Sequence, residues 1–394
     1  MIAFQFERPA CQRKHGETCL SFFFINLNFT ESLYLILFIN SGQSVITGVA
    51  MSERDWLIPG VALTFLMGSM ALLVMPSVSG LLPALSILPA WIAAAALIAG
   101  LYGFAWMMLH GIAQPLLGTV RFAREHKGRL LIVASAILLA GLNMIAFMWV
   151  KPLLNYLVPF WADPLLASWD RILFLGHEPW QVLDWFSFPA MGMVYHPVWF
   201  LVMIDSLLMA AFAPASPGKS AVLLNYFVLW SVIGPLIHCL LPAAGPIFYE
   251  RMGYGSRFGG LDGGAEATAV ANYLWSIYAS ESFGAGSGIS AMPSMHVTIS
   301  SWVVLAFYMF ARPWLPLALV FWLLIFLLSI SLGWHYAVDG LVGAVAAAAC
   351  HLALMGIFRM RMEGNSAAAK GASVRANPCL SVQAGSGELP RLGS

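Results

Sequence analysis

Two short polar segments of the chain carry residue types that can transfer a phosphoryl group. The segment 288–296 reads GISAMPSMH and ends in His296, and the segment 331–339 reads SLGWHYAVD and contains His335 and Asp339. The last two residues are spaced i, i+4, so on a helix they would share one face. Asp339 would then accept a hydrogen bond from one ring nitrogen of His335 and leave the other nitrogen free as a nucleophile. His296 is suited to protonate a leaving oxygen.

A predicted helix start next to His296 supplies the anion-binding part of this chemistry. Ser294 precedes an apolar run, and free N–H groups in the first turn of a helix receive phosphate oxygens, helped by the helix dipole. Nucleophile, orienting carboxylate, acid and anion-binding amides together predict a phosphoryl-transfer site that works through a phosphohistidine. We expect no metal and no cofactor, because no Asp/Glu cluster of metal-site type accompanies the histidines.

The rest of the chain must position these groups inside a membrane. Of 394 residues, 60% are hydrophobic and only 9% are charged, and the mean hydropathy is +0.81. Soluble domains carry about 25% charged residues, so this composition excludes a soluble globular domain, a disordered chain and a disulfide scaffold. The net charge of +1 gives no basic field to attract nucleic acid. The sequence predicts an all-α, polytopic membrane helical bundle.

Apolar runs near the 20 or so residues that a spanning helix needs predict eight transmembrane helices. They are expected over 56–76, 83–108, 130–150, 190–213, 220–241, 294–311, 313–333 and 337–358. Lys and Arg in the short loops orient this bundle with its start and its basic loops in the cytoplasm. Both motifs then lie at the outer face. The 39 residues from His296 to His335 are enough for one helix that crosses to the cytoplasmic side and a second helix that returns.

Five regions follow from these spans. They are a doubtful N-terminal extension (1–50), N-terminal transmembrane helices (51–150), an extracytoplasmic interfacial segment with an amphipathic helix near 162–171 (151–189), a transmembrane core (190–358) and a disordered cytoplasmic tail (359–394). Glu31 lies in the middle of the one apolar run of the first region, where an acid is costly in a bilayer. We therefore expect translation to begin at Met51.

The paired motifs resemble those of a known family. Residues 293–296 (PSMH) and 333–339 (GWHYAVD) are similar to the second and third motifs of the type-2 phosphatidic acid phosphatase superfamily. The likeness is greater to its branch of inositol phosphorylceramide synthases and sphingomyelin synthases. The resemblance covers about 190–358 and implies a six-helix core with an extracytoplasmic site. It implies His335 as nucleophile, Asp339 as its orienting group, His296 as acid and base, and Ser294 as a phosphate contact.

The chain also departs from the phosphatase pattern. No Lys–Arg–Pro motif of that family occurs, and Ser329 stands where the third motif has an arginine. Residues 245–251 (GPIFYER) instead resemble the Pro-aromatic-Tyr segment of the synthase branch. Tyr249 and Arg251 of this segment, with Arg257, are the predicted substrate contacts. Fewer fixed cations favour a singly charged phosphodiester over a dianionic phosphomonoester.

Three functions remain open at this point. The first is a metal-independent lipid phosphotransferase, inositolphosphotransferase-like, that acts on a lipid phosphate ester. The second is a lipid phosphatase, a hydrolase acting on phosphatidate or polyprenyl pyrophosphate, and the third is a non-catalytic lipid transporter. We expect membrane lipids as partners, no nucleic acid, and a multi-pass protein of the bacterial inner membrane with the active site facing the periplasm. The sequence leaves the oligomeric state open.

Three further polar residues lie within the apolar runs. Asp205 is interpreted as a buried hydrogen-bond partner of a neighbouring helix, with a functional role as the alternative, since acids inside membrane helices are costly. His196 and His238 fall near the outer ends of their helices. Each could line the site, although histidines are common at membrane interfaces.

Overall fold

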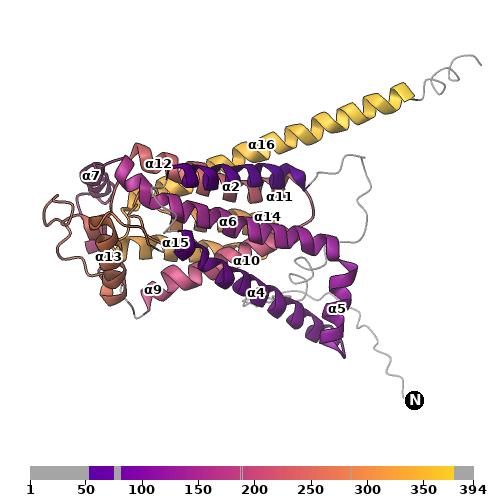
Figure 1. The fold of residues 1–394 in the computed structure, drawn as a ribbon, viewed down its shortest axis with the longest axis horizontal. Coiled ribbons are helices and arrows are strands. Elements are labelled where there is room, and N and C mark those ends of the chain that lie inside the picture. The colour runs from indigo at the N-terminus through magenta and orange to yellow at the C-terminus, as the bar shows by residue number, and fades with distance from the viewer. Residues whose placement is uncertain (1–52, 75–80, 187, 189, 285, 377–394) are drawn as a thin grey trace, which may run out of the picture.

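A computed structural model describes residues 53–74, 81–186, 188, 190–284 and 286–376, and within these residues every regular element is a helix (Figure 1). The predicted all-α bundle is therefore confirmed. The segment 1–50, with the expected start at Met51, lies outside the described residues.

Seven helical segments of the described residues are long and apolar enough to cross a membrane. Each coincides with a predicted span, so the multi-pass architecture read from hydropathy is confirmed. They are α2 (Arg54–Val74), α3 with α4 (Leu81–Leu85, Ile87–Leu109), α6 (Lys127–Leu157), α9 with α10 (Met191–Met193, Trp199–Phe212), α11 with α12 (Pro217–Val228, Gly234–Leu240), α15 (Leu315–Ser331) and α16 (Ala337–Ala376). Two of these segments contain a π-helical turn, at Val194–Val198 before α10 and at Leu229–Ile233 before α12.

The eighth predicted span is a shorter helix. α14 (Met295–Phe310) has 16 residues, about 24 Å at the α-helical rise, which is less than the hydrocarbon thickness of about 30 Å. The non-helical segment 288–294 precedes it and is mostly buried within the protein. Irregular backbone is tolerated at membrane depth where protein covers it, so the shortened helix recesses the first motif below the end of the bundle.

α14 lies at the centre of the bundle. It packs against α10, α15 and α16, while α6 packs against α2 and α10, and α11 packs against α2 and α16. Trp302 of α14 is fully buried, and its indole N–H donates to the carbonyl of Val222 on α11 at 2.8 Å. The helix that carries the first histidine is thus held on several sides.

The two ends of the bundle differ in chemistry. α7 (Asp163–Leu173), α8 (Pro179–Val182) and α13 (Gly264–Ala279) gather at the end where α14 and α16 begin, and α5 (Pro115–Glu125) lies at the other (Figure 1). The basic residues of the short loops meet at the α5 end, where Lys219 pairs with Glu53 at 2.7 Å and Arg129 donates to the carbonyl of Phe212. Both motifs therefore lie at the end opposite the basic loops.

The C-terminal region differs from the prediction. The sequence predicts disorder from residue 359, whereas α16 continues as helix to Ala376. Alanine-rich segments have the highest helix propensity, which explains why residues 359–376 extend the last span. Residues 377–394 lie outside the described part of the chain.

Candidate active site

The segment before α14 is fixed to the surrounding helices residue by residue. Asn155 of α6 donates to the carbonyl of Ile289 at 2.6 Å and accepts its N–H at 2.8 Å. The hydroxyl of Ser290 lies 2.9 Å from Nδ1 of His238 on α12. His238 thus supports the first motif. These contacts hold the next residue, Ala291, in the position where it meets the second motif.

His335 is oriented by a backbone carbonyl. Its Nδ1 lies 2.7 Å from the carbonyl oxygen of Ala291. A carbonyl only accepts hydrogen bonds, so Nδ1 carries the proton and Nε2 keeps the lone pair of a nucleophile. The predicted orienting group, Asp339, has Oδ2 at 3.7 Å from Nδ1, beyond hydrogen-bond distance, and accepts the N–H of Tyr336 at 2.8 Å instead. The two side chains do meet at i, i+4 spacing, but His335 precedes α16, which begins at Ala337, and the orienting role of Asp339 stays a prediction.

Burial also keeps the His335 ring uncharged. His335 is only 6% exposed, and burial, followed by the positive charge of Lys151, lowers its pKa to about 3 despite the hydrogen bond to Ala291. The ring is therefore neutral, with a free lone pair, throughout the physiological pH range. This is the protonation state that attack on phosphorus requires.

His296 lies in an aromatic cage at the start of α14. Its ring stacks on Tyr195 with centroids 4.2 Å apart and lies 4.4 Å from Trp199. His196 meets it edge-on at 5.4 Å, and the Trp199 indole donates to the His296 carbonyl at 3.0 Å. The π-helical turn that contains Tyr195 and His196 supplies two of these rings, and such turns are frequent at functional sites.

The two histidines belong to one cluster. The first motif contacts the second through the Ala291 carbonyl and the Ser294 N–H, and the His196 ring lies 5.4 Å from His296 and 6.3 Å from Trp334, the neighbour of His335 in the chain. The predicted return of the second motif to the level of the first is therefore observed. His196, one of the two undecided histidines of the sequence analysis, lines this cluster.

Ser294 has a structural role here. Its side chain caps α14 by accepting the N–H of Val297 at 3.5 Å, and the residue is fully buried. Its own N–H donates to the Asp339 carbonyl at 3.3 Å, which ties the start of α14 to the first turn of α16. The predicted phosphate contact of Ser294 stays a prediction, and the helix cap is what the geometry supports.

Two buried aspartates of α7 hold the loops around the site. Asp163 accepts the N–H groups of Ala244 and Gly245 at 2.9 and 2.8 Å and the hydroxyl of Tyr336 at 2.9 Å. Asp170 accepts two N–H groups at the start of α16, at 2.7 and 2.9 Å. The segment predicted as an interfacial amphipathic helix is a helix, and it fixes the loop that carries His335.

We predict that Asp170→Ala destabilises the protein in a pH-dependent way. Two buried N–H groups of α16 lose their acceptor, which costs about 2 kcal/mol of unfolding free energy. Burial raises the pKa of Asp170 to about 7, above that of an unfolded carboxyl, so its contribution to stability falls as pH rises from about 4 to 7. Thermal unfolding in detergent should show a larger loss at pH 5 than at pH 8, and Asp184→Ala, an exposed site near α8, should show none. An equal loss at both pH values would contradict this titration.

Gly245 allows the loop after α12 to touch the second motif. Its φ is +103°, and a Cβ built there would lie 2.5 Å from the carbonyl oxygen of Trp334. The neighbouring contact, from the N–H of Ile247 to the carbonyl of Gly333 at 2.9 Å, shows how closely the two backbones run. No side chain fits between them.

We therefore predict that Gly245→Ala lowers activity by about tenfold or more, because the loop that carries His335 must shift. The matched control is Gly253→Ala: this glycine also has a positive φ, +83°, but a Cβ there meets no atom within 4 Å. Turnover and thermal unfolding of both variants separate the two effects. Equal losses of activity would mean that backbone strain, and not the contact with Trp334, matters.

The predicted substrate contacts of the outer loop are engaged elsewhere. Arg257 forms an ion pair with Glu178, with Nε 2.9 Å from Oε1. Arg251 is exposed, donates to Asn272 on α13 and lies over the Trp275 ring at 5.7 Å. Tyr249 is buried in an apolar cluster that also contains Ala291 and Met292 of the first motif and Tyr336 of the second. None of the three has a contact with the histidines in the described residues, so their substrate role stays a prediction.

A cation that the sequence analysis missed lies next to the histidines instead. Lys151 belongs to α6, one turn before Asn155, and a Cβ built on Gly288 would lie 3.0 Å from its Cγ. Its charge acts on His238, His296 and His335. None of the ion pairs among the described residues includes Lys151. In the sequence, Lys151 is a single lysine at the outer end of an apolar run. That position is typical of an interfacial anchor, so it did not indicate a functional residue.

The described residues contain no group of three or more His, Cys, Asp or Glu side chains placed to hold a metal ion. The cluster contains His296, His335 and His196 in an aromatic and backbone framework, and Lys151 lies beside Gly288 of the first motif. Such an arrangement can bind a phosphate ester, attack its phosphorus and move a proton to a leaving group.

The fold and the site define a multi-pass helical membrane protein with one buried and one half-buried histidine, His335 and His296, at one end. A sequence model of the PAP2 superfamily matches residues 164–353, which include both motifs and all of α7 except its first residue, Asp163. This match supports a lipid phosphatase or phosphotransferase type of function, and it confirms the resemblance at the level of the superfamily. Comparison with curated proteins and with solved structures gives no match.

Proposed function

We propose that this protein is a membrane-embedded phosphotransferase that moves a phosphoryl-linked head group from a lipid phosphate ester through a phosphohistidine on His335. The observation that carries the proposal is the hydrogen bond from Nδ1 of His335 to the Ala291 carbonyl, at 2.7 Å. It leaves the Nε2 lone pair as the reacting group in a neutral ring. The superfamily match over residues 164–353 supports the same reaction class.

The reaction divides into two displacements. In the first, Nε2 of His335 attacks phosphorus, the bond from phosphorus to the lipid oxygen breaks, and His296 donates a proton to that oxygen. In the second, His296 takes a proton from an acceptor hydroxyl, whose oxygen attacks phosphorus and frees Nε2. A lipid hydroxyl as acceptor gives transfer, and water as acceptor gives hydrolysis.

Lys151 supports a phosphodiester as the donor. It is the one cation described close to the histidines, and it has no carboxylate partner among the described residues. A single positive charge matches the single negative charge of a phosphodiester better than the two charges of a phosphomonoester. This agrees with the missing third-motif arginine and favours the inositolphosphotransferase-like branch.

The membrane orientation follows from the charge difference between the two ends. Lys219, Arg129 and the arginines of α5 lie at the end away from the histidines. The positive-inside rule supports a cytoplasmic position for that end and, with it, an extracytoplasmic position for the site. In a bacterial inner membrane this is the periplasmic face.

Reconstitution tests the proposal directly. Purified protein in vesicles receives a phospholipid labelled in its head group, together with a lipid alcohol, and the lipids are separated after incubation. We expect the label to move to the lipid alcohol. Release of inorganic phosphate from phosphatidate or polyprenyl pyrophosphate without transfer would establish the phosphatase instead, and lipid movement across the bilayer without bond cleavage would establish a transporter.

A further inference from the structure

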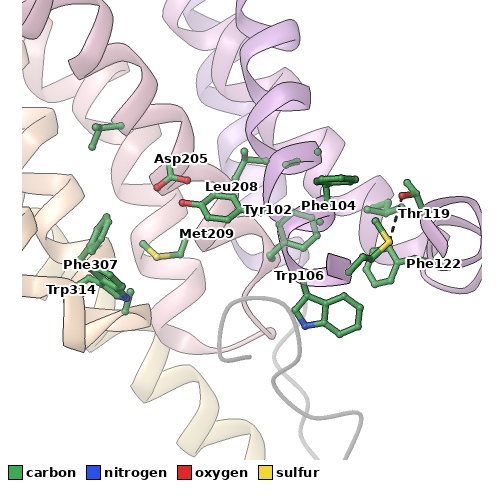
Figure 2. Close-up of a pocket in the computed structure, with 18 of the residues that line it drawn as sticks. Tyr102, Phe104, Trp106, Thr119, Phe122, Asp205, Leu208, Met209, Phe307 and Trp314 are labelled. Carbon is green, nitrogen blue, oxygen red and sulfur yellow. Dashed lines mark hydrogen bonds between the residues drawn. The ribbon is translucent and has the colours of Figure 1, made fainter. Parts of the chain in front are cut away.

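A second cavity lies in the half of the bundle away from the histidines. It has a volume of about 760 Å³ and lies between α4, α5, α10, α14 and α15 (Figure 2). Its wall is almost entirely apolar, with aromatic side chains that include Phe104, Phe122, Phe307 and Trp314. Cavities of this size and character are typical of small-molecule sites.

Small residues of α4 create this space. Ala99, Gly100 and Gly103 line the cavity, and a Cβ built on either glycine meets no atom within 4 Å. Larger side chains at these positions would fill the cavity without a clash. Since glycine costs about 1 kcal/mol relative to alanine in a helix, two glycines beside an open volume favour a site that is kept free for an occupant.

One polar pair interrupts the apolar wall. Figure 2 shows the Tyr102 hydroxyl directed at the Asp205 carboxyl, and the two side chains interact electrostatically. Asp205 therefore lies next to a polar side chain of the neighbouring helix α4, and its interpretation as a hydrogen-bond partner stays a prediction. The hydrogen bonds of the described residues include none to the Asp205 side chain, whereas a carboxyl group can accept several. An acid in a spanning helix with unused acceptor capacity indicates a ligand.

The position of Asp205 indicates what kind of ligand fits. It lies about 10 Å along the helix axis from Phe212, where α10 ends, and thus inside the apolar part of the span. A membrane crevice at this depth is filled by lipid chains. A phosphate head group would have to leave water to reach this depth, so its desolvation cost disfavours a phospholipid. A hydroxyl group donates to the carboxylate and carries no charge.

We propose that the cavity binds an uncharged lipid alcohol, with its chains against the apolar wall and its hydroxyl donating to Asp205. Diacylglycerol and ceramide share this chemistry. The site is distinct from the histidine cluster, because His196 and Asp205 are nine residues apart on one helical segment, roughly 13 Å along its axis. The proposal does not depend on the reaction proposed for His335.

Photolabelling of the full chain in nanodiscs tests the proposal. The probes are a diacylglycerol and a ceramide, each with a diazirine in the acyl chain, and a phosphatidylcholine with the same labelled chain. We expect α4 and α10 peptides to be labelled by at least one alcohol about tenfold more than by the phosphatidylcholine, and the two alcohol probes identify the source. Equal labelling by all three probes would overturn the proposal, because a cavity that accepts any lipid chain does not select for a hydroxyl head group.

Variants connect the labelling to the cavity. Gly103→Leu fills the volume and Asp205→Leu removes the acceptor, so each should reduce alcohol labelling about tenfold. The matched control is Gly68→Leu on α2, another helix glycine where a Cβ meets nothing within 4 Å and which does not line the cavity. His335→Ala should label like the parent protein, which keeps a failure here separate from a failure of the proposed reaction. Unchanged labelling of a folded Gly103→Leu variant would overturn the proposal.

Discussion

Replacing His335 with alanine is expected to lower turnover of the lipid phosphate ester by at least about 10³-fold. The substitution removes the Nε2 lone pair. The other imidazoles whose Nδ1 meets a backbone carbonyl, His110 and His126, lie at the C-terminal ends of α4 and α5, away from the two motifs. The fold should persist, because the loop is also fixed by the N–H of His335, which donates to the Ser329 carbonyl at 3.1 Å.

Two measurements make this test specific. Rapid mixing of the parent protein with phosphorus-labelled donor should trap a phosphoenzyme that is stable to base and labile to acid, and His335→Ala should trap none. The control is His351→Ala, which removes another buried histidine of the neighbouring helix α16. Turnover that survives in His335→Ala would exclude the phosphohistidine, and equal losses in both variants would indicate a general folding defect.

Lys151→Ala is expected to lower kcat/KM by about 10- to 100-fold. A hydrogen bond to a charged group contributes roughly 1.5–3 kcal/mol, and each 1.4 kcal/mol is a factor of about ten. Lys151 lies beside Gly288, and its charge reaches both His296 and His335, so a phosphate bound between the rings would meet it. Lys151→Arg, which keeps the charge, should recover part of the activity.

Lys127→Ala provides the control, because it removes the same residue type from the other end of the same helix, α6. It should leave kcat/KM unchanged. If Lys151 binds substrate only, KM rises while kcat is retained; if it also stabilises the transition state, kcat falls as well. Equal activity of Lys151→Ala and Lys127→Ala would remove Lys151 from the site.

The sequence predicts the spans and the pairing of the two histidines because both depend on local patterns. Hydropathy over some 20 residues defines each helix, and the spacing of the motifs fixes that His296 and His335 meet at one end. The one span that departs, α14, does so because the first motif continues as buried non-helical backbone before the helix starts at Met295.

The remaining parts of the site depend on contacts between residues far apart in the chain. The acceptor for His335 is a backbone carbonyl 44 residues away. Every residue has such a carbonyl, so a sequence motif cannot single this one out. Asp163 and Asp170 read as the polar face of an amphipathic helix, yet their carboxylates are buried against loops more than 80 residues away. Arg251 and Arg257 were plausible phosphate ligands by charge, but only the structure reveals their partners on α13 and α8.

The origin of Lys151 in α6 has a consequence for how this chain can be divided. The part that matches the superfamily begins at residue 164, so it contains the nucleophile and the acid but neither Lys151 nor Asn155. A transplant of that part into another membrane protein would carry the reactive rings without their cation and without the amide that holds the first motif. If the proposed reaction holds, the helices before residue 164 form part of the catalytic unit, and an exchange of α6 between homologues is expected to alter head-group preference.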